Sequence, residues 1–381
     1  ITFNGGTYGR PSVDDDGNLT YSLGSKRGLI GVIIHEIGHI YFPMTVNSDE
    51  RQWTWMDEGL NSFLQFQAER QWEEDFPVRR GDPHSITSYM VSSNQMPIMT
   101  QSDSIVQFGP NAYSKPTIAL VILRETVLGR ELFDEAFRTY SRRWRFRRPT
   151  PYDFFRTMEE VSGVDLDWFW RGWFYSTDHV DISLDRVIEG SFNTENPEIE
   201  NMLERTEAAN DPESLTQASN RADGISTYAS RNPEVLDYYS ENDSFTVTNR
   251  EREAYEILRE ELEDWEAEIL DSGDRVYYLD FTNEGGVVMP IILEFTFADG
   301  STDLVRIPAE VWRYDPHSVT WTYLTDRQVV SVELDPLWET ADADRTDNYF
   351  PPRIEPTRLE LYRSSSSPSS MMADQDLRVT R

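Results

Sequence analysis

The spacing of apolar residues predicts that residues 1–180 are mostly helical, after a short strand-like start at residues 1–3. Apolar side chains recur every three or four positions from Leu166 to Phe174, which indicates a helix with one buried face. Pro43 and the polar run at residues 47–49 separate two earlier helices. The first of these ends near residue 41, and the predicted helices after it cover residues 53–74, 113–128, 131–145 and 152–161.

The later part of the chain has a different pattern. From about residue 190 to 248 the chain is acidic and weakly patterned, and residues 250–270 are typical of one charged surface helix. After Gly273, apolar and polar positions alternate between turn signals such as Asn283–Gly286, which is typical of strands in a small β-sandwich. The predicted strands cover residues 275–279, 287–297, 304–307 and 329–334.

These patterns predict a mainly α domain followed by a small all-β sandwich. We expect four parts along the chain: a helical domain at residues 1–180, an acidic linker or helical region at 181–272, the sandwich at 273–340, and a low-complexity tail at 341–381. With 38% hydrophobic and 13% aromatic residues, the chain has enough apolar surface for a sizeable core.

The charge is concentrated in the second half. Residues 1–180 carry 18 basic and 24 acidic side chains, a net of −6, whereas the remaining residues carry 17 and 44, a net of −27. The total of −33 argues against a nucleic acid or an anionic membrane as partner, because phosphates would be repelled.

The chain contains no cysteine, which excludes disulfides, thiolate catalysis and cysteine–zinc sites. Its longest apolar run, residues 28–34, is much shorter than the roughly 18 residues of a membrane span. The sequence leaves the oligomeric state and the compartment open, with a periplasmic, secreted or outer-surface bacterial location slightly favoured.

The motif with the clearest chemistry is His35-Glu36-Ile37-Gly38-His39. Two histidines four residues apart lie on one face of a helix, so both imidazoles can reach a single metal ion. Glu36 is placed to act on a metal-bound water. An amphipathic helix that carries two histidines by chance is the competing interpretation. The apolar residues on both sides of the motif favour the metal, because they predict that the motif is held inside the fold.

A third ligand follows from the spacing. Phe42 and Thr45 stand where a metzincin site requires glycine and histidine, so that class is excluded. Glu58 follows His39 after 18 intervening residues, and two antiparallel helices would bring it beside the histidines. Two imidazoles and one carboxylate leave a fourth zinc position open, as in catalytic sites.

With this spacing and its surrounding Trp55-Met56-Asp57-Glu58-Gly59 segment, the chain resembles the gluzincin zinc aminopeptidases, the alanyl-aminopeptidase and leukotriene-hydrolase group. The resemblance covers residues 1–180 well and the β-rich segment less specifically. It implies a thermolysin-like zinc domain that binds one Zn²⁺ through His35, His39 and Glu58. It also implies peptide substrates and Glu36 as general base, most naturally for removal of N-terminal residues.

The resemblance extends to a tyrosine. In Ala112-Tyr113-Ser114-Lys115-Pro116, Tyr113 matches the family residue that hydrogen-bonds the oxyanion of the tetrahedral intermediate. An ordinary tyrosine at a helix start is the competing interpretation of Tyr113.

The chain departs from the family pattern in two places. The exopeptidase motif that binds the substrate's free amino group has no match in residues 1–34, so the catalytic domain is expected to be truncated at its N-terminus. Ser62 stands where a thermolysin-like site carries an aspartate that orients a zinc histidine. A zinc endopeptidase and a non-catalytic peptide-binding scaffold with a vestigial zinc site therefore stay as alternatives.

Two short aspartate-rich segments resemble fragments of calcium-binding loops. They are residues 14–18 and the group Asp342, Asp344 and Asp347. Neither has the twelve-residue spacing with a terminal glutamate, so we interpret both as loop composition.

Overall fold

The computed structural model describes residues 12–13, 17, 19–76 and 80–353. The predicted strand-like start at residues 1–3 and most of the predicted tail lie outside these residues. Contacts divide the chain into two compact units. The first comprises Ile1–Val187, Leu279–Trp321 and Val329–Arg381, and the second comprises Ile188–Tyr278 and Thr322–Gln328.

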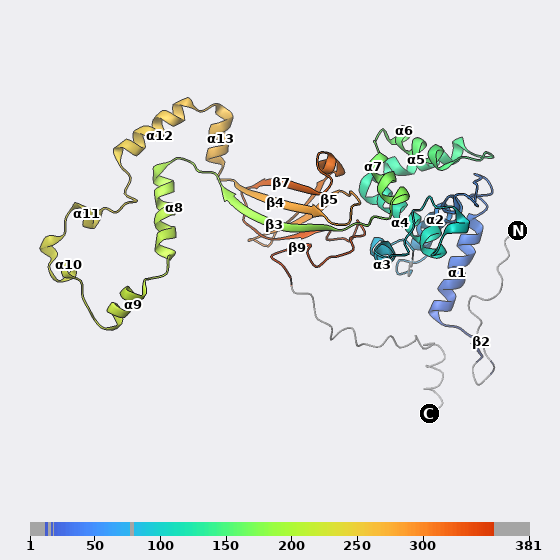
Figure 1. The fold of residues 1–381 in the computed structure, drawn as a ribbon, viewed down its shortest axis with the longest axis horizontal. Helices are drawn as coiled ribbons and strands as arrows, with labels where there is room; N and C mark the ends of the chain where they lie inside the picture. Colours follow the sequence, from blue (N-terminus) through green and yellow to red (C-terminus); the bar gives the residue numbers. More distant parts are fainter. Residues whose placement is uncertain (1–11, 14–16, 18, 77–79, 354–381) are drawn as a thin grey trace. The chain divides into compact units, whose positions relative to one another are not determined.

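The first part of the chain is helical, as its apolar spacing predicts (Figure 1). After a hairpin of β1 (Ser12–Val13) and β2 (Leu19–Thr20), its helices are α1 (Leu23–Gly38), α2 (Glu58–Trp72), α3 (Thr87–Met90), α4 (Lys115–Ile122), α5 (Arg130–Arg143), α6 (Pro151–Ser162) and α7 (Asp167–Trp170). Helix α4 is flanked by two π-helical segments, Gly109–Ser114 and Leu123–Val127. A third, Arg171–Tyr175, follows α7.

Aromatic side chains form the core of this helical part. The ring of Trp55 lies 4.9 Å from that of Phe174 and 5.7 Å from that of Phe154, centroid to centroid. Tyr140 packs edge-on against Phe154 at 4.9 Å. These contacts pack α6 and the segment after α7 against the turn that precedes α2.

The β-rich part consists of two sheets. Strands β3 (Ile182–Ser191), β4 (Arg275–Asn283) and β7 (Ser318–Thr325) form a three-stranded sheet in the order β3-β4-β7. Strands β6 (Thr302–Ile307), β5 (Ile291–Phe297), β8 (Val329–Leu334) and β9 (Tyr349–Phe350) form a four-stranded sheet, in which neighbouring strands are antiparallel. Helices together with antiparallel sheets agree with the coarse fold class that the sequence predicts.

The segment between β3 and β4 contains six helices: α8 (Pro197–Asn210), α9 (Leu215–Ala222), α10 (Tyr228–Arg231), α11 (Tyr238–Glu241), α12 (Asn249–Glu261) and α13 (Asp264–Ser272). The single helix expected at residues 250–270 is therefore wrong, because α12 and α13 are separate. A capping box starts α13: the Glu263 side chain accepts from the backbone N–H of Glu266, and the Glu266 carboxylate accepts from the backbone N–H of Glu263 at 2.9 Å.

The elements also differ from the expected parts at two boundaries. Strand β3 occupies residues that the sequence analysis assigned to the acidic linker. Residues 341–353, assigned to the tail, contain β9 and the buried Asn348. Strand β3 pairs with β4, which is distant in sequence, so local composition did not reveal that pairing.

Candidate metal centre

The motif helix α1 begins at a side-chain cap and ends at the second histidine. The Ser22 hydroxyl accepts a hydrogen bond from the backbone N–H of Ser25, 3.1 Å away. At the other end His39 is the C-cap, and its N–H donates to the carbonyl of His35 at 3.2 Å. The two histidines are therefore one helical turn apart, as the spacing predicts.

The apolar residues beside the motif do not bury it. Ile37 is 55% exposed and Ile40 is 60% exposed, and the buried residues of α1 are Gly31 and His35. The expectation that an apolar helix holds the motif inside the fold is therefore wrong. The histidine side is covered by α2, whose residues Glu58 and Asn61 contact it.

Close approach of α1 and α2 depends on Gly38. A Cβ atom at this position would lie 2.0 Å from Oδ1 of Asn61. Asn61 is fully buried, and its amide donates to the carbonyl of His35 at 2.8 Å. The glycine thus admits the side chain that ties α2 to the backbone of the first histidine.

Three side chains converge at this helix–helix contact. The Nε2 atoms of His35 and His39 lie 3.1 Å and 3.4 Å from the same carboxylate oxygen of Glu58, Oε2. Two ligand atoms held 2.0–2.1 Å from a tetrahedral zinc lie about 3.3–3.4 Å apart. The separations therefore match a tetrahedral ligand set, and the donor types suit zinc.

The other ring nitrogens are held by acceptors. Nδ1 of His35 lies 2.9 Å from Oε1 of Gln65, and Nδ1 of His39 lies 2.9 Å from the carbonyl oxygen of Phe42. An Nδ1–H that donates to these oxygens leaves the Nε2 lone pair free for a metal. Oδ1 of Asp57 lies 3.0 Å from Nδ1 of His39, an ion-pair contact beside that hydrogen bond.

Charge at the site is shared among these groups. Burial opposes ionisation of Glu58, but hydrogen bonds from His35, His39 and Tyr113 lower its pKa to about 2. Burial disfavours a charged His39, yet hydrogen bonds to Asp57, Glu58 and the Phe42 carbonyl raise its pKa to about 10. Burial also raises the pKa of Asp57. The pocket therefore favours a positive charge between these acceptors, which a proton or a metal cation can supply.

Tyr113 lies at the same site, on the π-helical segment before α4. Its ring stacks on that of His35 with 5.9 Å between centroids, and its hydroxyl hydrogen-bonds the Glu58 carboxylate. The guanidinium of Arg80 lies 4.6 Å from the Tyr113 ring centroid. Burial, together with the Glu58 charge, raises the pKa of Tyr113, so the hydroxyl is a hydrogen-bond donor at neutral pH.

Glu36 follows His35 on α1 and is half-buried. Its carboxylate makes no hydrogen bond or ion pair within the part of the chain that the structure describes. The structure thus brings together four of the five predicted site residues by direct contact, and places the fifth next to them in the chain.

Sequence reasoning missed the groups that orient the histidines. Gln65 lies two helical turns after Glu58, on the same face of α2, and this spacing was the available signal. The Phe42 acceptor is a backbone oxygen, which no residue type reveals. Gln65 and the Phe42 carbonyl take the place of the aspartate that is absent at Ser62.

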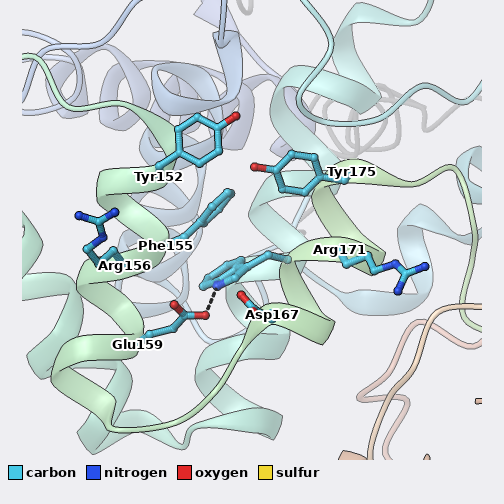
Figure 2. A pocket seen from close by; sticks show the side chains of 8 residues that line it. Tyr152, Phe155, Arg156, Glu159, Asp167, Arg171 and Tyr175 are labelled. Atoms are coloured by element: carbon cyan, nitrogen blue, oxygen red, sulfur yellow. Dashed lines mark hydrogen bonds between the residues drawn. The ribbon is translucent and has the colours of Figure 1, made fainter. Parts of the chain in front are cut away.

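A separate surface cavity of about 340 Å³ lies between α6 and the segment that follows Asp167 (Figure 2). Figure 2 shows the hydroxyls of Tyr152 and Tyr175 facing each other above Phe155. The indole N–H of Trp170 donates to Oε1 of Glu159, 3.1 Å away. The cavity has no residue in common with the histidine site.

An H-E-x-x-H helix whose histidines meet a glutamate of the next helix defines the gluzincin class of metallopeptidases. Residues 13–173 match the family described as the peptidase family M1 domain. The matched segment contains His35, His39 and Glu58 and is similar to the catalytic domain of that family.

The similar proteins are aminopeptidases. The mouse (Mus musculus) glutamyl aminopeptidase is 26% identical over 172 residues, which is 42% of this chain and 18% of the relative. That of Bitis rhinoceros is 29% identical over 159 residues, 38% of this chain and 16% of the relative. The aligned segment therefore spans less than a fifth of these relatives. The structure of Legionella pneumophila aminopeptidase A with aspartic acid has a TM-score of 0.45 and 12% identity, covering 84% of this chain and 27% of that one.

Within the described residues, no helix combines the length and the apolar character that crossing a membrane requires.

Proposed function

We propose that the chain binds one Zn²⁺ at His35, His39 and Glu58 and hydrolyses peptide bonds, with release of N-terminal amino acids as the reaction. The observation that carries the proposal is the convergence of both Nε2 atoms on Oε2 of Glu58, at 3.1 Å and 3.4 Å. These separations suit neighbouring ligands of one tetrahedral ion. The similarity of residues 13–173 to the M1 domain and the glutamyl aminopeptidase relatives support the aminopeptidase assignment.

Zinc held there would polarise the scissile carbonyl and lower the pKa of a water molecule. The chain's own groups have separate tasks. Glu36 takes the proton of the attacking water and delivers it to the departing amine. The Tyr113 hydroxyl leaves Glu58 and donates to the oxygen that becomes negative in the transition state. Gln65 and the Phe42 carbonyl hold the imidazoles in one tautomer.

The test compares two substrates on the zinc-loaded chain, an aminoacyl arylamide and an N-blocked quenched peptide, each with and without a chelator. The proposal predicts chelator-sensitive hydrolysis of the arylamide alone, restored by adding zinc. Cleavage of the blocked peptide would make the protein an endopeptidase. Stoichiometric zinc without cleavage of either substrate would support the scaffold interpretation and refute the catalytic one.

A further inference from the structure

A second group of acidic residues is assembled by two segments distant in sequence. Val180 and Asp342 form a parallel β-bridge, and the N–H of Ala343 donates to the carbonyl of Val180 at 2.9 Å. A second bond runs from the N–H of Leu184 to the carbonyl of Asp347, at 3.2 Å. Asp181 is thereby placed beside the loop of residues 342–348. We name Asp181, Asp342, Asp347 and Asn348 the bridge cluster.

The bridge cluster is partly buried, and three of its oxygen atoms have no hydrogen-bond donor, whereas the carboxylate of Asp342 also accepts from the backbone N–H of Asp344 at 3.2 Å. Asn348 is 0% exposed and Asp342 is 6% exposed. The amide nitrogen of Asn348 donates to Oδ2 of Asp342 at 3.1 Å, which places the amide beside that carboxylate. Its carbonyl oxygen is buried without a partner, and so is one carboxylate oxygen each of Asp181 and Asp347. A buried acceptor without a donor costs free energy, so these oxygens indicate a binding partner outside the chain.

Asp335, by comparison, is a buried aspartate whose carboxylate has hydrogen-bond donors for both of its oxygens. Asp335 is 1% exposed. It accepts three hydrogen bonds, from the backbone of Glu339 at 2.6 Å and from the backbone and hydroxyl of Thr340 at 3.1 Å and 2.7 Å. No comparable set of donors reaches the orphaned oxygens of the bridge cluster, so its missing partner is of another kind.

One basic group contacts the bridge cluster: Nε2 of His179 lies 3.6 Å from Oδ2 of Asp181. Arg345 is directed to other acids: its nitrogens lie 3.6 Å from Glu333 and 3.9 Å from Asp335, and it donates to the Asp335 carbonyl. Burial, reinforced by neighbouring carboxylates, raises the pKa of Asp342 to about 8 and that of Asp347 to about 6.

We propose that the bridge cluster binds one Ca²⁺ ion, through the carboxylates of Asp181, Asp342 and Asp347 and the amide oxygen of Asn348. Calcium prefers oxygen ligands of these types and accepts irregular geometry. The carboxylates have not converged to within 4.8 Å, as the exposed group Glu159, Asp165 and Asp167 has. A divalent cation between the carboxylates would offset their mutual repulsion.

This proposal revises the sequence-based interpretation of Asp342 and Asp347 as loop composition. A single calcium-binding loop needs twelve residues because one segment supplies every ligand. Here Asp181 comes from a different segment, so that spacing is not required. Asp344 is exposed, and its carboxylate accepts from the hydroxyl and backbone of Thr346 at 2.7 Å and 2.9 Å, so we leave it out of the ligand set.

The test uses the zinc-loaded chain freed of other divalent ions, at constant ionic strength. Calorimetric titration with CaCl₂ should give one site per chain, and the thermal midpoint should rise with calcium. Asp342→Asn and Asp347→Asn should each weaken calcium binding on the order of tenfold or more, since one charged ligand is lost. Both variants keep the side-chain shape, and circular dichroism checks that they fold.

Asp165→Asn is the matched control, because it removes one carboxylate from the exposed acidic group. It should leave calcium binding unchanged. The proposal is overturned if no calcium binds up to roughly 10 mM, beyond the weakest protein sites. It is overturned equally if binding survives in both bridge-cluster variants, or if Mg²⁺ stabilises the chain as well as Ca²⁺ does.

Discussion

Replacing Gly38 by alanine tests how the metal centre is assembled. The new methyl group would lie 2.0 Å from Oδ1 of Asn61, so the side chain must move by more than about 1 Å to reach an ordinary contact distance. Asn61 is fully buried and has no room to swing into solvent. Its 2.8 Å hydrogen bond to the His35 carbonyl would therefore break, or α2 would shift away from α1.

The size of the effect follows from two terms. Overpacking a buried contact costs about 1–3 kcal/mol. Leaving a buried amide without its acceptor costs a further 1–3 kcal/mol or so. Against these, alanine in place of glycine stabilises a helix by about 0.5–1 kcal/mol. We expect Gly38→Ala to destabilise the chain by about 2–4 kcal/mol, and to weaken zinc binding because α2 carries Glu58.

Urea unfolding and competitive zinc titration measure both effects. Gly28→Ala is the matched control: it lies on the same helix, and its Cβ would meet nothing within 4 Å. It should raise stability by about 0.5–1 kcal/mol and leave zinc affinity unchanged. In the double variant Gly38→Ala/Asn61→Ala the obstruction is gone, so its loss of stability should be smaller than the sum of the single losses. Additive losses, or a stabilising Gly38→Ala, would refute the reasoning.

Three further predictions concern single side chains. Glu36→Gln should keep zinc but lower kcat by about 10²–10⁴, and zinc analysis with arylamide assays checks both; normal turnover would exclude Glu36 as base. Gln65→Leu should weaken zinc binding by about 10–100-fold, whereas Gln67→Leu on the same helix should not. Lys115 is fully buried, and burial lowers its pKa to about 7 from 10.5. Between these pH values the unfolded chain binds more protons than the folded chain. The free-energy cost of burying Lys115 should therefore fall as the pH rises from 7 toward 10.5. Relative to wild type, Lys115→Met should therefore lose stability over this range in urea titrations, and a pH-independent difference would contradict the burial argument.

The sequence predicted the contact of Glu58 with the two histidines better than the surroundings of that contact, because the two depend on interactions of different range. His35 and His39 are related by one helical turn, which the sequence states directly. Glu58 required only the assumption that two helices joined by a short connection lie side by side. The apolar residues of the motif helix were predicted to hold it inside the fold, but Ile37 is 55% exposed, while His35 is buried.

In the β-rich part, too, some elements were predicted from the sequence and others were missed. Strands with a clear alternation of apolar and polar residues, such as β5 and β8, were predicted. Strand β7 was missed, since its burial pattern lacks a fully buried face over most of its length. Strand β3 was missed because its partner β4 lies beyond a long helical segment. Register and partner choice depend on such distant contacts, which composition does not encode.

The H-E-x-x-H motif of this chain contains more than its ligands, because the residue before His39 is the glycine that lets α2 approach. The five residues from His35 to His39 therefore determine both the spacing of the two histidines and the approach of α2 to α1. The orientation of the imidazoles is set elsewhere, by a side chain two turns into α2 and by a backbone carbonyl three residues beyond His39. A backbone acceptor can be supplied by any residue type, so the orienting groups can change while the ligands stay. The absent aspartate at Ser62 is therefore no argument against a working site, since both Nδ1 atoms already have acceptors at 2.9 Å.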